Sequence, residues 1–592
     1  MELSTLRALF LFLLLQGLSF SLGLGIEDPF HWAHVSPSDK LEWIDCYTDL
    51  QCARLTVLLN YSEPEGENIA IAVIQFPSSF PRDSPDYLGP ILVNPGGPGG
   101  SGVDFLRRIG HIFSELFDSR FDIVSFDPRG VARSARVSFF DTDVERELWA
   151  YSALEELGGK PEGVSMAWAK AAITGRLAGE HDTGILAHIN TDHTARDMLK
   201  ITQAYGYEKI QYWGFSYGTV LGATFASMFP DKVGRIIIDG VVDADNYYAT
   251  LWSNNLVDSD KTLQAFFDGC FEAGPQNCPF YADNPKAISN RLDTLYENIR
   301  TNPIPVKLES SYGILDYPRL RAAIFRSLYT PNTAYPILAQ ALADSESGNG
   351  TLLFSMIEQS SEGFECSCDP SVTALAPVVD SQMAIMCNDG APIPRSLKAA
   401  QSHYDRMTEA FDWGSMWAGL RISCSGWPEL PKDNFQGPFI ANTSHPLLLI
   451  GNTADPVTPL VATKHMSKGF TGSVVLTQDS PGHCSLAAPS LCTQQYIREY
   501  FFNGTLPDPG TVCPVMGGPF PKATSLEDDK QAVFSAEERR RLFVARELTH
   551  SFGAGRLGPS VSCYLIVMPH TFRVMSSARV KFKVTAPVGR GQ

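Results

Sequence analysis

Charged side chains are scarce in this chain of 592 residues, and basic ones are outnumbered by acidic ones. Only 19% of the residues are charged, with 47 Lys and Arg against 65 Asp and Glu. The net charge of −18 argues against nucleic acid or an anionic membrane as a partner, because both attract basic proteins. Since 44% of the residues are hydrophobic, the chain can bury a large core and is expected to fold.

Long apolar runs are missing beyond the N-terminus, which argues against a membrane-spanning helix later in the chain. Residues 1–25 contain Arg7, an apolar run over residues 8–15 and then several small residues. That run is shorter than the roughly 20 residues needed to cross a bilayer, so it is typical of a cleaved secretory signal peptide. The sequence therefore predicts a secreted, extracellular protein with no membrane contact after cleavage.

The twelve cysteines include no Cys-x-x-Cys pair, so no metal site is expected, and no cofactor is predicted either. Two pairs lie close together in the sequence, Cys46 with Cys52 and Cys270 with Cys278, as in disulfide-bonded secreted proteins. Asn-x-Ser/Thr triplets, which are acceptors for N-glycosylation, add independent support for a secreted glycoprotein. They stand at Asn60, Asn349, Asn442 and Asn503.

Short apolar runs bounded by Gly, Pro or Asp predict buried strands. They occupy residues 70–76, 91–93, 121–126, 210–213, 235–238, 447–450 and 474–477. Helical patterns lie between several of them, as at residues 191–205, where apolar residues recur at a spacing of three. This alternation predicts an α/β fold, with a mostly parallel sheet covered by helices on both faces.

The strand pattern stops between residues 245 and 441, where six cysteines and helical stretches such as residues 315–329 occur. We expect an inserted, largely helical cap domain there, with an independent second domain as the alternative. The predicted organisation is a signal peptide at 1–25, the first part of the core at 26–244, the cap at 245–441, the C-terminal part of the core at 442–520, and a C-terminal helix with a basic tail at 521–592.

The C-terminal segment begins with a capping box at residues 535–538, which predicts a helix that continues through Leu548. From Arg556 to the end there are six basic residues and no acidic one. Because this composition differs from the rest of the chain, we expect the tail to lie outside the catalytic fold.

A five-residue motif, Gly214-Phe215-Ser216-Tyr217-Gly218, lies between a predicted strand and a predicted helix. This is the context of a nucleophile elbow, a turn so tight that its flanking positions must be small. The turn exposes the serine at a helix N-terminus, where negative charge is favoured. We therefore predict that Ser216 is a catalytic nucleophile.

A nucleophilic serine needs a general base and a carboxylate that orients it. Asp455 lies on the loop after the predicted strand 447–450, and His483 lies on the loop after the predicted strand 474–477. The order Ser, Asp, His is that of the α/β hydrolases. The alternatives are a turn carboxylate and a surface histidine, but their positions at strand ends favour a catalytic triad.

A glycine-rich loop at residues 94–102 follows the predicted strand 91–93. Glycines let a backbone approach a substrate closely, so this loop is a candidate for half of an oxyanion hole. We predict that the N–H groups of Gly97 and Tyr217 form the hole. A phosphate-binding loop is the alternative, but the Gly-Lys-Ser/Thr sequence of such loops is absent.

Together these motifs resemble the secreted α/β-hydrolase serine peptidases of the proline-iminopeptidase and tripeptidyl-aminopeptidase group. The resemblance extends from about residue 40 to Cys513 and rests on residues 95–99, 127–134, 214–218, 455–459 and 482–483. It implies an aminopeptidase that removes short N-terminal units from peptides through an acyl-enzyme. Family loops often begin with His, where this chain has Pro95.

The resemblance also implies that an acidic residue of the cap holds the free α-amine of the peptide. Asp389, beside Cys387, is our candidate, and Glu362, Glu365 and Asp369 are the alternatives. An esterase or another acyl hydrolase on the same fold is the alternative function. A catalytically inactive binding protein is disfavoured by the complete triad.

Overall fold

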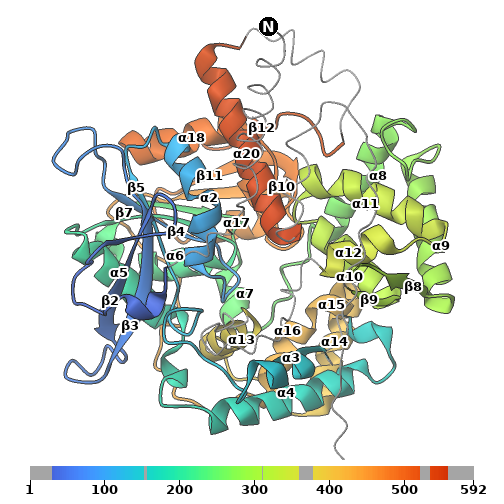
Figure 1. The fold of residues 1–592 in the computed structure, drawn as a ribbon, viewed down its shortest axis with the longest axis horizontal. Coiled ribbons are helices and arrows are strands. Elements are labelled where there is room, and N and C mark those ends of the chain that lie inside the picture. The colour runs from blue at the N-terminus through green and yellow to red at the C-terminus, as the bar shows by residue number, and fades with distance from the viewer. Residues whose placement is uncertain (1–29, 152–155, 310, 359–377, 521–533, 558–592) are drawn as a thin grey trace, which may run out of the picture.

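A computed structural model describes residues 30–151, 156–309, 311–358, 378–520 and 534–557, so the predicted signal peptide lies outside it. A ten-stranded sheet forms its centre, in the order β1-β2-β3-β5-β4-β6-β7-β10-β11-β12 (Figure 1). The strands are β1 (Ile44–Cys46), β2 (Leu50–Leu58), β3 (Asn68–Phe76), β4 (Pro90–Asn94), β5 (Asp122–Phe126), β6 (Ile210–Phe215), β7 (Val233–Asp239), β10 (Leu448–Ala454), β11 (Val474–Pro481) and β12 (Val512–Pro514).

Strands β1, β2 and β3 are antiparallel to their neighbours, whereas every pairing from β5 to β12 is parallel. The prediction of an α/β fold with a mostly parallel sheet is thereby confirmed. The carboxyl ends of parallel strands meet at one edge of a sheet, which is where such folds bind ligands. The loops after β4, β6, β10 and β11, which carry the predicted catalytic residues, therefore gather at that edge.

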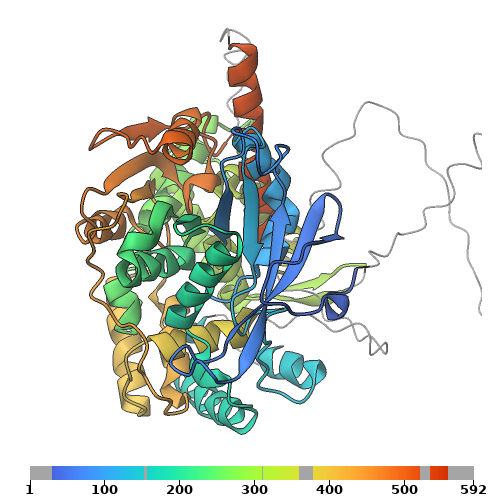
Figure 2. The same cartoon turned by 90° about the vertical axis from the view of Figure 1, so that its left-hand side faces the viewer.

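Both faces of the sheet are buried, because neighbouring residues of each strand point to opposite sides. Leu92 of β4 belongs to the core on one face, while Ile91 and Val93 belong to the core on the other. Helices α5 (Thr191–Ala204) and α6 (Tyr217–Met228) cover the first face. The second is covered by α2 (Gly102–Leu116), α18 (Leu491–Asn503) and α20 (Ala536–Leu557), seen beside the sheet in Figure 2.

The predicted capping box at the start of α20 is confirmed. The Ser535 side chain accepts a hydrogen bond from the Glu538 N–H (3.1 Å), and the Glu538 carboxylate accepts one from the Ser535 N–H (2.8 Å). Further along α20, Val544, Leu548 and Phe552 are buried in the same core as α2. The last described helix is therefore part of the hydrolase core.

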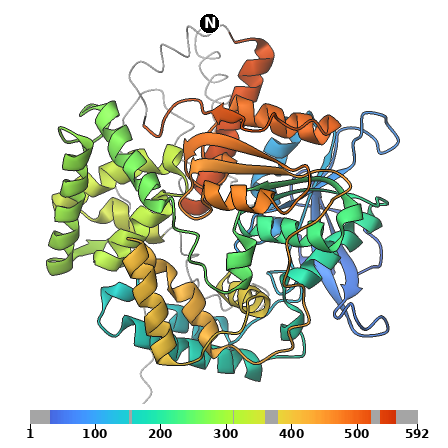
Figure 3. The same ribbon diagram turned by 180° about the vertical axis from the view of Figure 1, so that it is seen from behind.

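Helices between residues 259 and 423 surround a second core, away from the sheet (Figure 3). They are α8 (Ser259–Ala273), α9 (Pro285–Thr301), α10 (Tyr317–Ser327), α11 (Pro331–Glu346), α12 (Thr351–Glu358), α14 (Leu397–Ala410), α15 (Gly414–Trp417) and α16 (Gly419–Ser423), with the hairpin β8 (Ile304–Lys307) and β9 (Tyr312–Leu315). Two helices cross the predicted boundaries. Helix α4 (Gly163–Glu180) packs against α14 and α16, whereas α13 (Val378–Asp389) contributes to the core of the sheet. The division into domains stays a prediction.

Four disulfide bonds are present among the described residues, and two of them join the cysteines that lie close together in the sequence, Cys46–Cys52 and Cys270–Cys278. Cys387 pairs with Cys424, and Cys492 pairs with Cys513. Among the helices that the structure describes, none has the length and apolar character needed to span a bilayer.

Candidate active site

Ser216 occupies the turn between β6 and α6, with φ +57° and ψ −123°. This backbone conformation is strained for a residue other than glycine, and such strain gathers at functional sites. The Ser216 N–H donates to the backbone oxygen of Asp239 at the end of β7 (3.1 Å). A Cβ on Gly214 would lie 2.4 Å from the Gly218 oxygen, so the turn requires glycine two positions before the serine.

Asp455 and His483 are in contact at the ends of β10 and β11. His483 Nδ1 lies 3.0 and 3.1 Å from the two carboxylate oxygens of Asp455, and both residues are fully buried. The Asp455 carboxylate also accepts hydrogen bonds from the N–H groups of Thr458 (2.8 Å) and Cys484 (2.9 Å). Burial alone would raise the pKa of Asp455, but the charge and hydrogen bond of His483 hold that pKa below its usual value. Asp455 is therefore an ionised partner for the imidazole.

The second ring nitrogen of His483, Nε2, is buried and has no hydrogen-bond partner among the residues described here. Because Nδ1 contacts Asp455, Nε2 is the nitrogen that can exchange a proton with a nucleophile. The Tyr329 ring packs edge-on against the imidazole, with centroids 5.2 Å apart. The backbone oxygen of Tyr329 also accepts a hydrogen bond from the backbone N–H of His483 (2.8 Å). No sequence motif indicated this tyrosine, since it lies on the inserted segment.

The glycine-rich loop after β4 lies against the elbow. A Cβ on Gly96 would come within 2.4 Å of the Phe215 oxygen and 2.9 Å of Ser216 Cβ, so the two loops touch through backbone atoms. Gly97, Ser216 and Tyr217 line one cavity. The two residues predicted to supply the oxyanion donors thus lie at the same cavity as the nucleophile, and the oxyanion hole itself stays a prediction.

The loop after β5, residues 127–134, anchors the glycine-rich loop. The buried Asp127 carboxylate accepts hydrogen bonds from the Ser101 hydroxyl (2.6 Å), the Val103 N–H (3.1 Å) and the Arg133 N–H (3.1 Å). In the same loop, Arg129 forms a fully buried ion pair with Asp197 of α5 (2.6 Å). The bonds of Asp127 hold the start of α2, which directly follows the glycine-rich loop, whereas the Arg129 pair joins the same loop to α5.

The cavity at Ser216 has a volume of about 380 Å³, within the range of small-ligand sites. Its wall is mostly aromatic and aliphatic, with Gln382 and Asn255 among the polar contributors. No acidic side chain lines it within the described ranges. Glu362, Glu365 and Asp369, the alternative acids of the cap, lie outside those ranges.

Asp389 is not brought to the cavity wall. It lies at the end of α13, fully buried, and accepts hydrogen bonds from the Thr191 N–H (2.8 Å), the Thr191 hydroxyl (2.5 Å) and the Tyr247 hydroxyl (2.7 Å). Burial raises the pKa of its carboxyl to about 6. Tyr247 itself lines the cavity, so Asp389 lies behind this tyrosine.

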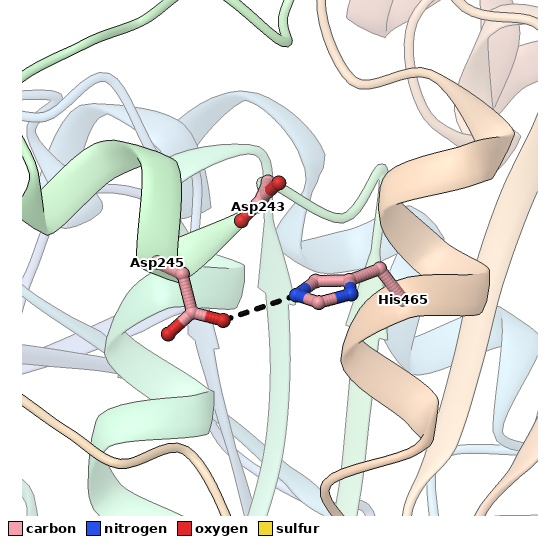
Figure 4. A group of neighbouring side chains, drawn as sticks. All are labelled: Asp243, Asp245 and His465. Carbon is pink, nitrogen blue, oxygen red and sulfur yellow. Dashed lines mark hydrogen bonds and ion pairs between the residues drawn. The ribbon is translucent and has the colours of Figure 1, made fainter.

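One group of metal-ligating side chains is found in the described part of the chain, with ligand atoms within 4.8 Å of one another: Asp243, Asp245 and His465 (Figure 4). Asp245 and His465 contact each other at 3.0 Å. Asp243 caps α7 (Ala244–Tyr248) through the Asn246 N–H (3.1 Å) and accepts a hydrogen bond from Asn254 (2.7 Å). Each member thus already has a protein partner, and we assign no cation to the group.

Comparisons with known proteins agree with this geometry. Residues 89–310 match the alpha/beta hydrolase fold family, and residues 409–513 match the TAP-like protein family. The serine protease Hip1 of Mycobacterium tuberculosis is 28% identical over 478 residues, covering 78% of this chain and 87% of the relative. The tripeptidyl aminopeptidase of Streptomyces lividans is 25% identical, with 78% and 84% covered. Carboxylesterase B of Mycobacterium tuberculosis is 26% identical, with 78% and 86% covered.

The family matches cover the segments that carry the predicted catalytic residues. The first contains the glycine-rich loop and Ser216, and the second contains Asp455 and His483. The order of these segments and the parallel sheet beneath them are those of α/β hydrolases. The chain therefore belongs to the α/β hydrolases, as a serine hydrolase of their TAP-like group.

Proposed function

We propose that this protein is a secreted serine aminopeptidase that releases short N-terminal units from peptides through an acyl-enzyme. The observation that carries the proposal is the buried contact between His483 Nδ1 and Asp455 (3.0 Å), which leaves Nε2 for the serine at the strained elbow. The relatives named serine protease and tripeptidyl aminopeptidase support a peptide substrate.

In the proposed reaction, Ser216 Oγ attacks the scissile carbonyl carbon while His483 Nε2 takes the hydroxyl proton. Asp455 holds the imidazole in the required tautomer and stabilises its positive charge. The N–H groups of Gly97 and Tyr217 donate to the negative oxygen of the tetrahedral intermediate. His483 then protonates the leaving amine, and water hydrolyses the acyl-enzyme by the reverse sequence. The Ser–His hydrogen bond is often long in an unliganded enzyme and shortens when substrate binds.

The residues that line the cavity determine which substrate side chain fits beside the cleaved bond. Trp252, Phe325 and Trp417 contribute aromatic rings to its wall, so an apolar side chain next to the scissile carbonyl fits best. An aminopeptidase must also hold a cationic α-amine, for which a carboxylate is needed. Asp389 could act on that amine only through Tyr247, so the acids of residues 359–377 are stronger candidates.

Secretion belongs to the same proposal. Four disulfide bonds suit an oxidising compartment. Asn349, Asn442 and Asn503 are exposed, and Asn60 is half-buried. Such exposure suits N-glycosylation, because the acceptor asparagine must lie at the protein surface. The signal peptide proposed at residues 1–25 precedes the described residues.

A substrate panel tests the proposal. Fluorogenic amides of one, two and three residues are compared with their N-acetylated forms and with a short-chain ester. An aminopeptidase cleaves the free peptides, and acetylation lowers kcat/KM on the order of 10²-fold or more, because it removes a charge-assisted contact. Equal cleavage of free and acetylated peptides would refute the aminopeptidase assignment.

An esterase is the second candidate, favoured by the relative named carboxylesterase B and by the lack of acidic side chains in the described wall of the cavity. It predicts rapid hydrolysis of the ester and none of the amides in the same panel. An inactive binding protein would cleave neither substrate class.

A further inference from the structure

The helical cap contains a second cavity, with a volume of about 560 Å³. Side chains of α8, α9, α10 and α14, together with the turn before α15, line this space, which we call the cap cleft. Trp413 lines the cap cleft and Phe325 lines the cavity at Ser216, and their ring centroids are 5.2 Å apart. This pair of rings therefore lies between the two cavities.

The floor of the cap cleft contains a buried carboxylate that is only half satisfied. Glu156 is 3% exposed, and its Oε1 accepts a hydrogen bond from the Ser415 hydroxyl (2.7 Å). Its Oε2 has no hydrogen-bond partner among the described residues. The nearest guanidinium, that of Arg321, lies 3.6 Å from Oε1. A buried carboxylate oxygen without a donor is costly, so Glu156 is suited to accept one from a ligand.

The mouth of the cap cleft adds negative charge. Asp260 and Asp412 both line the cleft and are exposed at its opening. Although Asp260 is exposed, partial loss of water around its carboxyl, and then the charge of Asp412, raise the pKa of Asp260 above its usual value. Like charges held close together in this way are stabilised by a cation between them.

The cationic side chains of the cap cleft do not balance its acids. The lining includes four acidic residues, Glu156, Asp260, Asp293 and Asp412, against Arg300 and Arg321. Arg321 donates to the backbone oxygen of Asp412 (2.5 Å) and stacks on Trp413. Arg300 stacks on the Tyr317 ring at 3.5 Å. Two negative charges are left over, so an anionic ligand is disfavoured.

Aromatic rings line the remaining wall. Tyr296, Tyr404 and Trp413 face the cleft beside the acids. The Tyr296 hydroxyl lies near Arg321 and the Trp413 indole N–H lies near Asp260, but neither contact has hydrogen-bond geometry. Ring faces attract organic cations, and carboxylates fix their N–H groups.

We propose that the cap cleft binds a small organic cation, an ammonium or guanidinium group on an apolar or aromatic body, at a site separate from the cavity at Ser216. The cation donates to Glu156 Oε2, and Asp260 and Asp412 neutralise its charge. The proposal concerns binding alone and stands whether or not the protein is an aminopeptidase.

Calorimetric titration of the full-length protein tests this site. The probe is benzylammonium chloride, and benzyl alcohol is the neutral control of similar shape. We expect benzylammonium to bind at least tenfold more tightly than the alcohol, because only the cation meets the carboxylates. Equal affinities for the two compounds would overturn the proposal.

Variants locate the site. Glu156→Gln keeps the size and the acceptor for Ser415, and Asp412→Asn changes the mouth without touching the buried floor. Each is expected to weaken benzylammonium binding tenfold or more, whereas Glu409→Gln, an exposed acid on α14 outside the cleft, leaves it unchanged. Trp252→Ala alters the cavity at Ser216 and should also leave binding unchanged. Binding that is lost in Trp252→Ala and kept in both cleft variants would place the cation in the active cavity instead.

Discussion

Asp239 accepts two hydrogen bonds from Ser485, one from its N–H (2.8 Å) and one from its hydroxyl (2.5 Å). Asp239 ends β7, and Ser485 follows His483 by two residues. The backbone oxygen of Asp239 also accepts the N–H of Ser216 (3.1 Å). One residue thus holds the elbow and the histidine loop in a fixed relation, which makes it a positioning residue for the proposed reaction.

The stability of the protein should depend on pH through Asp239. Burial raises the pKa of its carboxyl to about 7. The folded state therefore holds the carboxyl proton of Asp239 more tightly than the unfolded state does. As pH rises from about 4, the pKa in the unfolded chain, to about 7, the pKa in the folded protein, the contribution of Asp239 to the free energy of unfolding falls. Asp239→Asn cannot titrate, and its stability relative to wild type should rise over that interval by up to about 1.4 kcal/mol per pH unit. Urea unfolding at pH 5 and pH 8 measures this; an identical difference at both pH values would contradict it.

Ser216→Ala should abolish turnover without changing the melting temperature, because the turn tolerates a small side chain while the covalent step needs the hydroxyl. Retained activity in the purified variant would rule out Ser216 as the nucleophile.

Asp455→Asn should lower kcat by about 10⁴-fold, because the amide no longer holds His483 in the required tautomer. Asp258→Asn is the matched control, since Asp258 is a nearby partly buried carboxylate with no hydrogen bond to His483 among those found. Steady-state kinetics on the best peptide amide compare the two. A small effect of Asp455→Asn would mean that another carboxylate orients the base.

Gly96→Ala tests the contact between the glycine-rich loop and the elbow. Gly96 has φ +90°, and a methyl group there would lie 2.4 Å from the Phe215 oxygen. Gly206 has nearly the same φ, +88°, with nothing within 4 Å of its Cβ position. Both substitutions should cost about 1 kcal/mol of stability from the backbone conformation. Only Gly96→Ala should also lower kcat/KM, by about 10²-fold or more, because it displaces the predicted oxyanion donors.

Local patterns in the sequence were enough to predict the fold class and the elbow. Strands β4, β5, β6, β7, β10 and β11 each contain a short apolar run, whereas the parallel strand β12 has only three residues and was not predicted. The residues after β6, β10 and β11 could be assigned from their order alone. Strand β2, which lies between β1 and β3, was missed, because its residues alternate between buried and half-buried rather than forming a continuous apolar run. Asp239 was also missed, since its role depends on a partner 246 residues away in the chain. No periodicity within one segment can reveal such a contact.

Asp389 is a second residue whose role could not be predicted from the sequence alone. Its position beside Cys387 suggested a fixed carboxylate, and Cys387 does form a disulfide with Cys424. The direction in which that carboxylate points depends on how α13 packs on α5, which no local pattern specifies.

For Asp389→Asn we expect a loss of stability with an unchanged preference for free over N-acetylated peptides, because the carboxylate binds Thr191 and Tyr247 rather than the cavity. Kinetics on both peptide forms, beside thermal unfolding, measure the two effects. A selective loss of activity on the free peptide would instead assign the α-amine to Asp389.

Two C-terminal deletions distinguish the role of helix α20 from that of the tail that follows it. Deletion of residues 558–592, which include most of the basic C-terminal segment, should leave the melting temperature and activity unchanged. Deletion of residues 534–592 also removes α20 and should cause aggregation, since it uncovers the apolar face of α2.

Two substitutions on α20 check that burial is the cause. Leu548→Ala, at 3% exposure, should cost about 2–5 kcal/mol, whereas Phe543→Ala, at 58% exposure, should cost little. Aggregation of the shorter deletion would show that the tail packs on the core, and equal effects of the two substitutions would show that α20 does not.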